Sequence, residues 1–354
     1  MIGAGAAGIA AAVSAARAGA KTLLLDARAS AGGTGGFSGL TTLCGLFDDA
    51  GNHLNDGFAR EFADAVAESA PVRMGKVFVL PYRPTKFRET AARLIASTPN
   101  LFADWNTPLR GSVCENGQIK RLNDIEVGAV IDCSGTAEVA RAIGAETFST
   151  DENTQASAVV FPLRNVSRQL ATPADMAQVL LPLARDGFPS LNLQPAFEPG
   201  EFTAKFAGSP EQVAALIAFL RANVRGFERC ETSPDAITQS HRAGRMVVGQ
   251  HVLTGAEVLR GERFSDAAAR CAWPIEQWDA RGSVRFRYLP AGVHYEIPTR
   301  SLRAARVKNL FMAGKTISAD VDAIASARVM GCCLATGAAA GILAAKSVAS
   351  SQFR

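Results

Sequence analysis

The chain has 354 residues, of which 48% are hydrophobic and 20% charged, and its formal net charge at pH 7 is +4. This length predicts two domains, or one domain with an insertion, and enough apolar residues for a sizeable core. The small net charge, without any block of like charges, argues against a nucleic-acid-binding protein.

The seven cysteines show no C-x-x-C spacing, which argues against a disulfide framework, a zinc ribbon or an iron–sulfur cluster. We therefore predict no metal site and a reducing, cytoplasmic location. Cys332 and Cys333 are neighbours in an apolar helix, where adjacent side chains point about 100° apart, so packing is favoured over a redox pair. The same region holds 17 uncharged residues, 329–345, which are too few and too small for a membrane span and favour a buried helix.

The first 36 residues contain a glycine pattern typical of dinucleotide-binding folds. Gly3, Gly5 and Gly8 fit G-x-G-x-x-G, in which the glycines allow a tight turn, close approach of backbone to a pyrophosphate, and helix–sheet packing. A helix is predicted over residues 7–18 and a buried parallel strand over residues 21–25. Asp26 ends this strand 18 residues after Gly8, near the spacing of a ribose-binding acid.

Two features of this stretch need comment. Only Met1 and Ile2 precede the glycines, whereas a complete strand is expected there, so the first strand is predicted to be missing from the sequence. Residues 31–36 are so rich in glycine that they predict a loop where backbone closely approaches a ligand. A flexible surface loop is the alternative.

The strand–glycine–helix pattern returns twice. Strand-like residues 127–131 lead to Ser134 and Gly135, and residues 309–313 lead to Gly314 and Lys315. Helices with apolar stripes are predicted over residues 57–69 and 86–96, and capped helices begin near Thr172 and Ser209. We predict a doubly wound α/β Rossmann-like domain from residues 1–150 and 288–354, with an α+β substrate domain, residues 151–287, inserted between them.

Few side chains are candidates for acid–base chemistry. His241 and His294 are the candidate proton acceptors, although a structural or solvated histidine is the alternative for each. Arg242, three residues before Arg245, could bind a carboxylate in bidentate fashion, and a surface ion pair is its alternative. These three residues, His294, His241 and Arg242, are the predicted catalytic group.

Several ordered motifs show a family resemblance. They are GAGAAG with Asp26, the Gly32 to Gly36 cluster, VIDCSGTAEVA, RAGRMVVGQHVLT, YEIPTRSL, and NLFMAGKTISA running through RVMGCCLATGAAAG. In this order they resemble the bacterial FAD-dependent oxidoreductases of the glutathione-reductase-like class, over most of the chain. Where relatives often carry histidine, this chain has Val321 and Trp278.

The resemblance implies FAD as cofactor. It implies that the first glycines meet the pyrophosphate, that Asp26 meets the adenosine ribose, and that the last helix begins near the isoalloxazine. It further implies that Cys44 could face the flavin, although an isolated cysteine is usually a small buried hydrophobe. The implied cofactor-binding residues are Gly3, Gly5, Gly8, Asp26, Gly33, Thr34, Gly35, Gly36, Ser134, Gly135, Gly314, Lys315, Ser318 and Arg328.

The resulting functional prediction is oxidation or dehydrogenation of a small organic substrate by hydride transfer to flavin N5. The substrate could bear a carboxylate, and no nucleic-acid or membrane partner is expected. Two alternatives stay open: an FAD-binding scaffold protein without redox turnover, and an NAD-using enzyme of the same fold.

Overall fold

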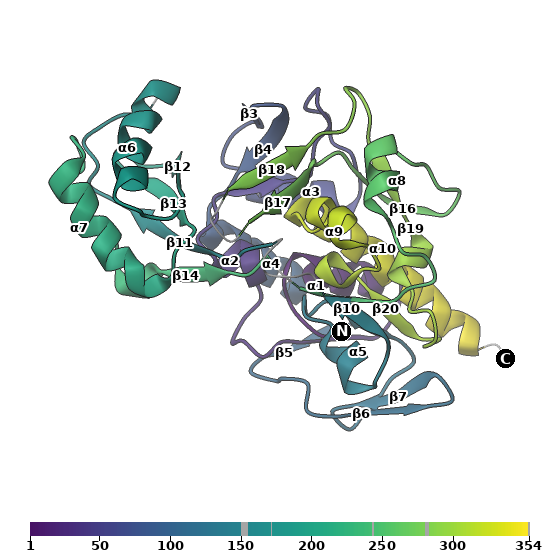
Figure 1. The fold of residues 1–354 in the computed structure, drawn as a ribbon. Helices are drawn as coiled ribbons and strands as arrows, with labels where there is room; N and C mark the ends of the chain where they lie inside the picture. The colour runs from purple at the N-terminus through teal and green to yellow at the C-terminus, as the bar shows by residue number, and fades with distance from the viewer. Residues whose placement is uncertain (150–154, 171, 243, 280–282, 353–354) are drawn as a thin grey trace.

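A parallel sheet lies at the centre of the molecule. The computed structural model describes residues 1–149, 155–170, 172–242, 244–279 and 283–352, which form a large body and a smaller lobe (Figure 1). In the body, β1 (Thr22–Leu25) pairs with β5 (Leu101–Asp104), and β9 (Val130–Asp132) pairs with β20 (Leu310–Met312), all in parallel. Ile2 bridges Leu25 and Asp132 and so joins the two halves. Residues 1–2 therefore keep the sheet continuous, although the segment before the glycines is short.

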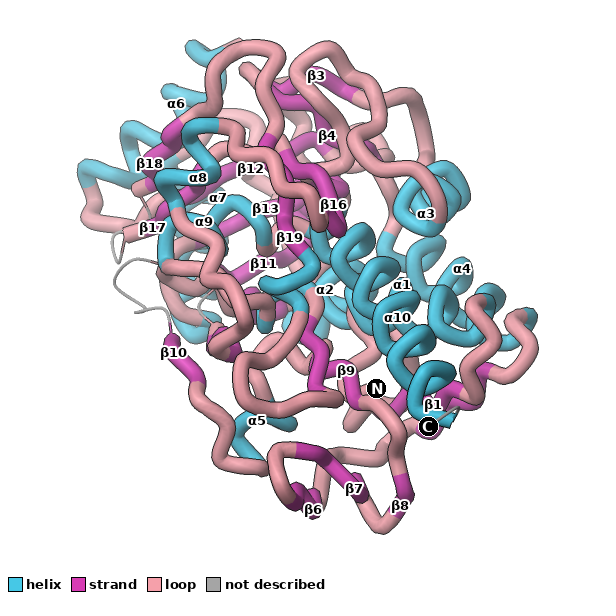
Figure 2. The backbone as a smooth tube through the Cα atoms, turned by 90° about the vertical axis from the view of Figure 1, so that its right-hand side faces the viewer, coloured by secondary structure: helices cyan, strands magenta, loops and turns pink. Residues whose placement is uncertain are grey.

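Helices cover one face of this sheet. Figure 2 shows α1 (Ala6–Arg17) and α10 (Met330–Gln352) side by side, next to α3 (Phe58–Val66) and α4 (Pro84–Ser97). The contact is close because a Cβ at Gly337 would lie 2.2 Å from the Ala7 oxygen, and one at Gly341 2.3 Å from the Ala11 oxygen. By length and composition α10 could also cross a membrane, yet 56% of its most apolar window is buried, as in a core helix. The predicted burial of this helix is confirmed.

An antiparallel sheet covers the other face. It consists of β6 (Ser112–Glu115), β7 (Gln118–Leu122) and β8 (Ile125–Glu126), and the β6–β7 turn has positive φ at Asn116 and Gly117. Ile119 and Leu122 pack there with residues of β9, β20 and α5 (Glu138–Ala142).

The remaining strands of the body form short antiparallel pairs around this centre, together with two helices. They are β2 (Thr42–Cys44), β4 (Val77–Pro81) and β3 (Val72–Met74); β10 (Thr147–Ser149) with β15 (Arg245–Val247); β16 (Ala267–Cys271) with β19 (Tyr295–Pro298); β17 (Ile275–Trp278) with β18 (Val284–Arg287); and the helices α8 (Gly255–Arg260) and α9 (Val321–Ala327).

The lobe has its own core. Its antiparallel sheet has the order β12 (Leu191–Pro195), β13 (Phe202–Phe206), β11 (Ala158–Leu163) and β14 (Thr238–Ser240), and α6 (Pro173–Arg185) and α7 (Val213–Asn223) cover it (Figure 1). Buried residues from Val159 to Cys230 form this core, whereas Met246 and Ile275 belong to the core of the body. The predicted α/β fold with an inserted α+β lobe is confirmed. The boundaries 151–287 stay a prediction, and residues 150 and 151 lie outside the described residues.

The glycine-rich stretch after Asp26 differs from its prediction as a loop. Residues Gly33–Phe37 form a short helix, α2. The helix packs on α4 so closely that a Cβ at Gly35 would lie 2.5 Å from the Phe87 ring, and one at Gly36 2.7 Å from the Arg88 side chain. The glycines are thus required by helix packing as well as by backbone conformation.

The cysteine prediction was wrong at one pair. Cys271 and Cys332 form a disulfide bond with a Cα–Cα distance of 6.2 Å, within the usual range. Strand β16 brings Cys271 to the first turns of α10 across 61 residues of sequence, a contact that no local pattern indicates. Cys333 stays a free buried thiol whose Sγ donates to the Arg328 oxygen.

Candidate cofactor and substrate site

The three glycine turns meet at the ends of the parallel strands. A Cβ at Gly8 would lie 1.7 Å from the Gly3 oxygen, and one at Gly3 would lie 2.6 Å from the Cys133 oxygen after β9. Gly314, after β20, approaches Ala7 in the same way, at 2.9 Å. Helix α1 begins here with no side-chain cap, so its first N–H groups are available to an anion.

Asp26 faces this turn from the end of β1. Its Oδ2 accepts a 2.6 Å hydrogen bond from the Ala4 N–H, and its Oδ1 accepts one from the Arg28 N–H. Gly33, with φ of +50°, lies so close that its Cβ would be 2.6 Å from the Gly5 Cα. Asp26, Gly33 and the first glycines therefore surround one location, whereas Thr34 is exposed and Gly35 and Gly36 pack on α4.

The turn after β9 is ordered by a buried carboxylate. Asp132 accepts hydrogen bonds from the Ser134 hydroxyl and from the Ser134 and Val139 N–H groups, and its burial raises its pKa above the ordinary value. The Ser134 hydroxyl is therefore used within the turn. Gly135 lies against Lys315, whose ammonium donates to the His241 oxygen at 3.3 Å and whose pKa burial lowers.

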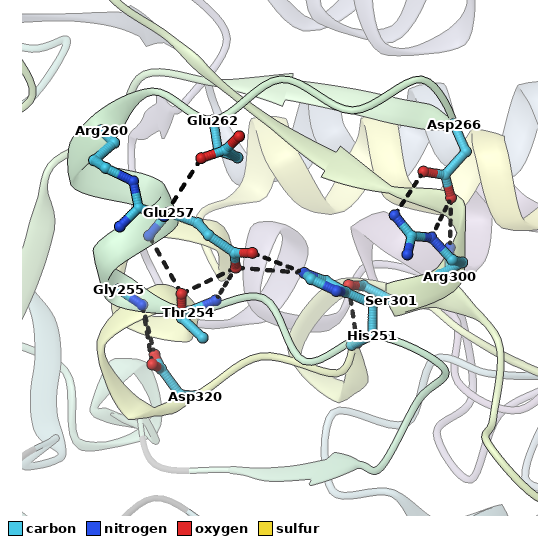
Figure 3. A network of polar contacts seen from close by, with 10 residues as sticks. All are labelled: His251, Thr254, Gly255, Glu257, Arg260, Glu262, Asp266, Arg300, Ser301 and Asp320. Carbon is cyan, nitrogen blue, oxygen red and sulfur yellow. Dashed lines mark hydrogen bonds and ion pairs between the residues drawn. The ribbon is translucent and has the colours of Figure 1, made fainter.

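The segment after Lys315 is held by the network in Figure 3. The Asp320 carboxylate accepts from the Gly255 N–H at 3.0 Å and from the Ala323 N–H at 2.7 Å, and so caps both α8 and α9. Thr254 and Glu257 form a capping box for α8, and Glu257 pairs with His251 at 3.2 Å. Two backbone hydrogen bonds hold residues 318–320 beside Leu253. The Leu253 N–H donates to the Ser318 oxygen, and the Asp320 N–H donates to the Leu253 oxygen.

Asp320 provides a direct test of that network. We expect Asp320→Ala to lower the free energy of unfolding by about 1–2 kcal/mol, because α9 loses its N-cap and the Gly255 N–H at the start of α8 loses its acceptor. Asp320→Asn keeps an acceptor and should lose less. Urea unfolding measures both, with the exposed Asp56→Ala as the matched control; equal stability of wild type and Asp320→Ala would contradict the proposed double cap.

A second polar cluster lies between the lobe and the body. The Glu276 carboxylate, on β17, accepts from the Trp278 indole at 2.6 Å and from the Trp273 indole at 2.9 Å. The Arg242 guanidinium stacks on the Trp278 ring, 4.0 Å from its centroid, and donates to the Ala156 oxygen at 2.7 Å. Burial and the neighbouring Arg328 lower the pKa of Arg242 to about 10. This contact and the hydrogen bond to Ala156 together hold the guanidinium against the Trp278 ring.

Arg328 lies at the end of α9, just before the α10 segment that the resemblance places near the isoalloxazine. Its Nη2 donates to the backbone carbonyl oxygen of Glu276 at 3.4 Å, while its Nε is buried without a hydrogen-bond partner among the described residues. The hydroxyl of Ser318, fully buried, is also unpartnered there. Buried polar groups are normally paired, so both atoms are suited to a polar ligand.

The candidate histidines occupy different surroundings. His241 is exposed, with its Nδ1 3.1 Å from the Ser157 hydroxyl, next to Arg242. His294 contacts Arg263 and lies near Glu296, and its pKa is lowered first by burial and then by Arg263 and Arg270. Among the described contacts, none joins His294 to the cluster of Arg242, Glu276 and Arg328, so the structure does not bring the predicted catalytic group together.

The residues at these turns fit an FAD molecule. The Gly3 to Gly8 turn and the bare α1 end suit its pyrophosphate, and Asp26 beside them suits a ribose. The buried, unpartnered atoms of Ser318 and Arg328 suit the polar edge of the flavin half. Lys315 next to Gly135 would add positive charge near the same turns.

Comparison with known protein families decides the identity. The sequence profile of the family described as FAD dependent oxidoreductase matches residues 1–186 and 184–353. The chain belongs to this family. FAD is therefore its cofactor, and the protein is an oxidoreductase enzyme. A comparison with curated protein sequences finds no significant match.

Two solved structures illustrate the shared fold. A geranylgeranyl bacteriochlorophyll reductase-like protein from Thermoplasma acidophilum is 14% identical, with a TM-score of 0.53; the match covers 99% of this chain and 78% of that one. GidA from Aquifex aeolicus is also 14% identical, with a TM-score of 0.56, and the match covers 99% of this chain and 63% of GidA. At this identity the likeness shows the fold alone.

Sequence reasoning missed three residues of the second cluster. Glu276 lies between Trp273 and Trp278 in the sequence. An acidic residue flanked by two tryptophans was the feature that could have indicated its role. Trp278 was noted only as a replacement for histidine. Lys205 lies within strand β13 of the inserted lobe, and its proximity to Cys44 depends on the tertiary fold.

Proposed function

We propose that this FAD-dependent oxidoreductase, of the glutathione-reductase-like class, dehydrogenates or oxidises a small organic carboxylate. The observation that carries the proposal is Arg242, a half-buried guanidinium stacked on Trp278 with no carboxylate at ion-pair distance among the described residues. A desolvated cation without a counter-charge is costly, so an anionic substrate group is its natural partner. An arginine held in one plane binds a carboxylate in bidentate fashion.

When bound, FAD would supply the acceptor for the two electrons that leave the substrate as a hydride. Arg242 binds and orients the substrate, and Glu276 keeps Trp278, and with it Arg242, in position through the indole hydrogen bond. The substrate proton released with the hydride passes to His241 or to water. His241 is the candidate acceptor because it adjoins Arg242 and is accessible.

The sequence left two alternatives open, an FAD-binding scaffold without turnover and an NAD-using enzyme, and membership of the FAD-dependent oxidoreductase family supports neither. The unpartnered Ser318 and Arg328 atoms, which suit the flavin half of FAD, disfavour the NAD-using alternative. A cytoplasmic location also stays a proposal, and the Cys271–Cys332 disulfide runs against it, since such bonds are rare in cytosolic proteins.

Anaerobic reduction tests the proposed function. FAD-loaded protein is mixed with a panel of small 2-hydroxy and 2-amino acids and with their uncharged methyl esters, and the visible flavin absorbance is followed. We expect at least one acid, and not its ester, to bleach the flavin. Arg242→Met should slow that bleaching by about 30-fold or more, the usual cost of removing a buried charge partner. Arg245→Met is the matched control, since Arg245 pairs with Thr147. Equal reduction by acid and ester would contradict the proposal.

A further inference from the structure

Lys205 reaches from the inserted lobe toward the body. It lies on β13 two residues after Thr203, and residues two apart in a strand face the same side. The Thr203 hydroxyl lies 3.2 Å from the Thr41 hydroxyl, which precedes β2 of the body. The Lys205 side chain is therefore directed at the same part of the body, where Cys44 ends β2.

The surroundings of Lys205 contain an excess of positive charge. The ionisable groups near enough to shift its pKa are Cys44 from β2, Glu276 from β17 and Arg242 from the segment before β15. Arg328 adds a further cation beside Glu276. The half-buried ammonium of Lys205 makes no hydrogen bond or ion pair with the part of the chain that the structure describes. Glu276 is thus the one carboxylate that raises the pKa of Lys205, Arg242 and Arg328 among the described residues, and it is already bound by two indoles.

We propose that Lys205 is a second anion-binding residue of the substrate site, so that a small organic acid lies between the lobe and the body with Arg242 and Lys205 on its carboxylate groups. This inference rests on the proposed function and adds the role of the inserted lobe. A carboxylate at this position compensates two cations that form no ion pair with the described residues. The lobe thereby contributes to substrate specificity through one side chain.

Cys44 provides a probe of this site that needs no turnover. Burial raises the pKa of its thiol to about 12, so its reaction is slow, but the ratio of its rates with anionic iodoacetate and neutral iodoacetamide cancels the thiolate fraction. Peptide mass spectrometry measures both rates at Cys44 and at the exposed Cys114 of the same protein. We expect a higher iodoacetate-to-iodoacetamide ratio at Cys44 than at Cys114, because local cations attract the anionic reagent.

Variants assign the effect to Lys205. Lys205→Gln should lower the Cys44 ratio by about threefold or more, whereas Lys205→Arg should retain it, since it keeps the charge. Lys346→Gln, on the exposed surface of α10, is the matched control. Malonate should protect Cys44 from iodoacetamide in the wild type and not in Lys205→Gln, while neutral malonamide should protect neither. An unchanged ratio in Lys205→Gln, or equal protection by malonate and malonamide, would overturn the inference.

The pH dependence separates Lys205 from a structural role. Burial lowers the pKa of its ammonium below the ordinary 10.5, with Cys44 and Glu276 raising it and Arg242 lowering it. Malonate protection requires the charged ammonium, so it should be lost as pH rises through this lowered pKa, and Lys205→Arg should preserve it to higher pH. Flavin bleaching by an acid and by its ester in the wild type is the separate check. Equal bleaching would defeat the proposed function, whereas acid-specific bleaching with an unchanged Cys44 ratio in Lys205→Gln would defeat only the role of Lys205.

Discussion

Replacing Gly8 with alanine is expected to yield protein without bound FAD and with unfolding free energy lowered by at least about 3 kcal/mol. The added Cβ would lie 1.7 Å from the Gly3 oxygen and 2.8 Å from its carbonyl carbon. Both atoms are backbone within the turn that receives the pyrophosphate, so relief of the clash must displace the turn itself. The visible absorbance of the purified variant and its urea unfolding curve measure the two effects.

Gly111→Ala is the matched control for this substitution. A Cβ at Gly111 meets no atom within 4 Å, and its φ is not in the left-handed region, so we expect wild-type flavin content. If Gly8→Ala bound FAD at the occupancy of the Gly111→Ala variant, the assignment of the pyrophosphate to this turn would be wrong.

Removing the Glu276 carboxylate is the second change with a large expected effect. Glu276→Ala should lower the unfolding free energy by about 3–5 kcal/mol, because two indole N–H groups lose their acceptor and the neighbouring Arg242, Arg328 and Lys205 lose the carboxylate they share. Glu276→Gln retains one acceptor oxygen and should lose less. Urea unfolding followed by tryptophan fluorescence is a sensitive measurement, since Trp273 and Trp278 contact the altered side chain.

The control for that comparison is Glu262→Ala. Glu262 pairs with Arg260 at the exposed surface, and such pairs contribute about 1 kcal/mol or less. If Glu276→Ala and Glu262→Ala had the same free energy of unfolding, Glu276 would not organise the cluster. Another residue would then have to position Arg242 and Trp278.

The cofactor half of the site was accessible to sequence reasoning because its signals are local. Gly3, Gly5 and Gly8 lie within one turn, and the strand that ends at Asp26 follows at a fixed distance, so spacing alone predicts that these groups meet. In the structure, this spacing brings the Asp26 carboxylate next to the first turn, where it accepts a hydrogen bond from the Ala4 N–H. Gly314 and Ser318 needed the family resemblance as well, since more than 300 residues separate them from the first turn.

What sequence reasoning missed is non-local. Helix α2 was predicted as a loop because glycine disfavours helices, and only contacts of Gly35 and Gly36 with α4 explain why a helix with these residues forms. The disulfide joins β16 to α10, and the cluster of Glu276, Arg242 and Lys205 joins three separate parts of the chain. Periodicity reports which side of an element is buried, but not which element it meets.

The visible absorption spectrum of the purified protein, with the bound nucleotide released and quantified, tests the account most directly. We expect a flavin spectrum with about one FAD for each chain, bleached by a chemical reductant, and loss of that spectrum in Gly8→Ala. A folded, colourless protein that takes up no added FAD and binds NAD instead would contradict the assignment of these glycine turns, Asp26, Ser318 and Arg328 to a flavin site.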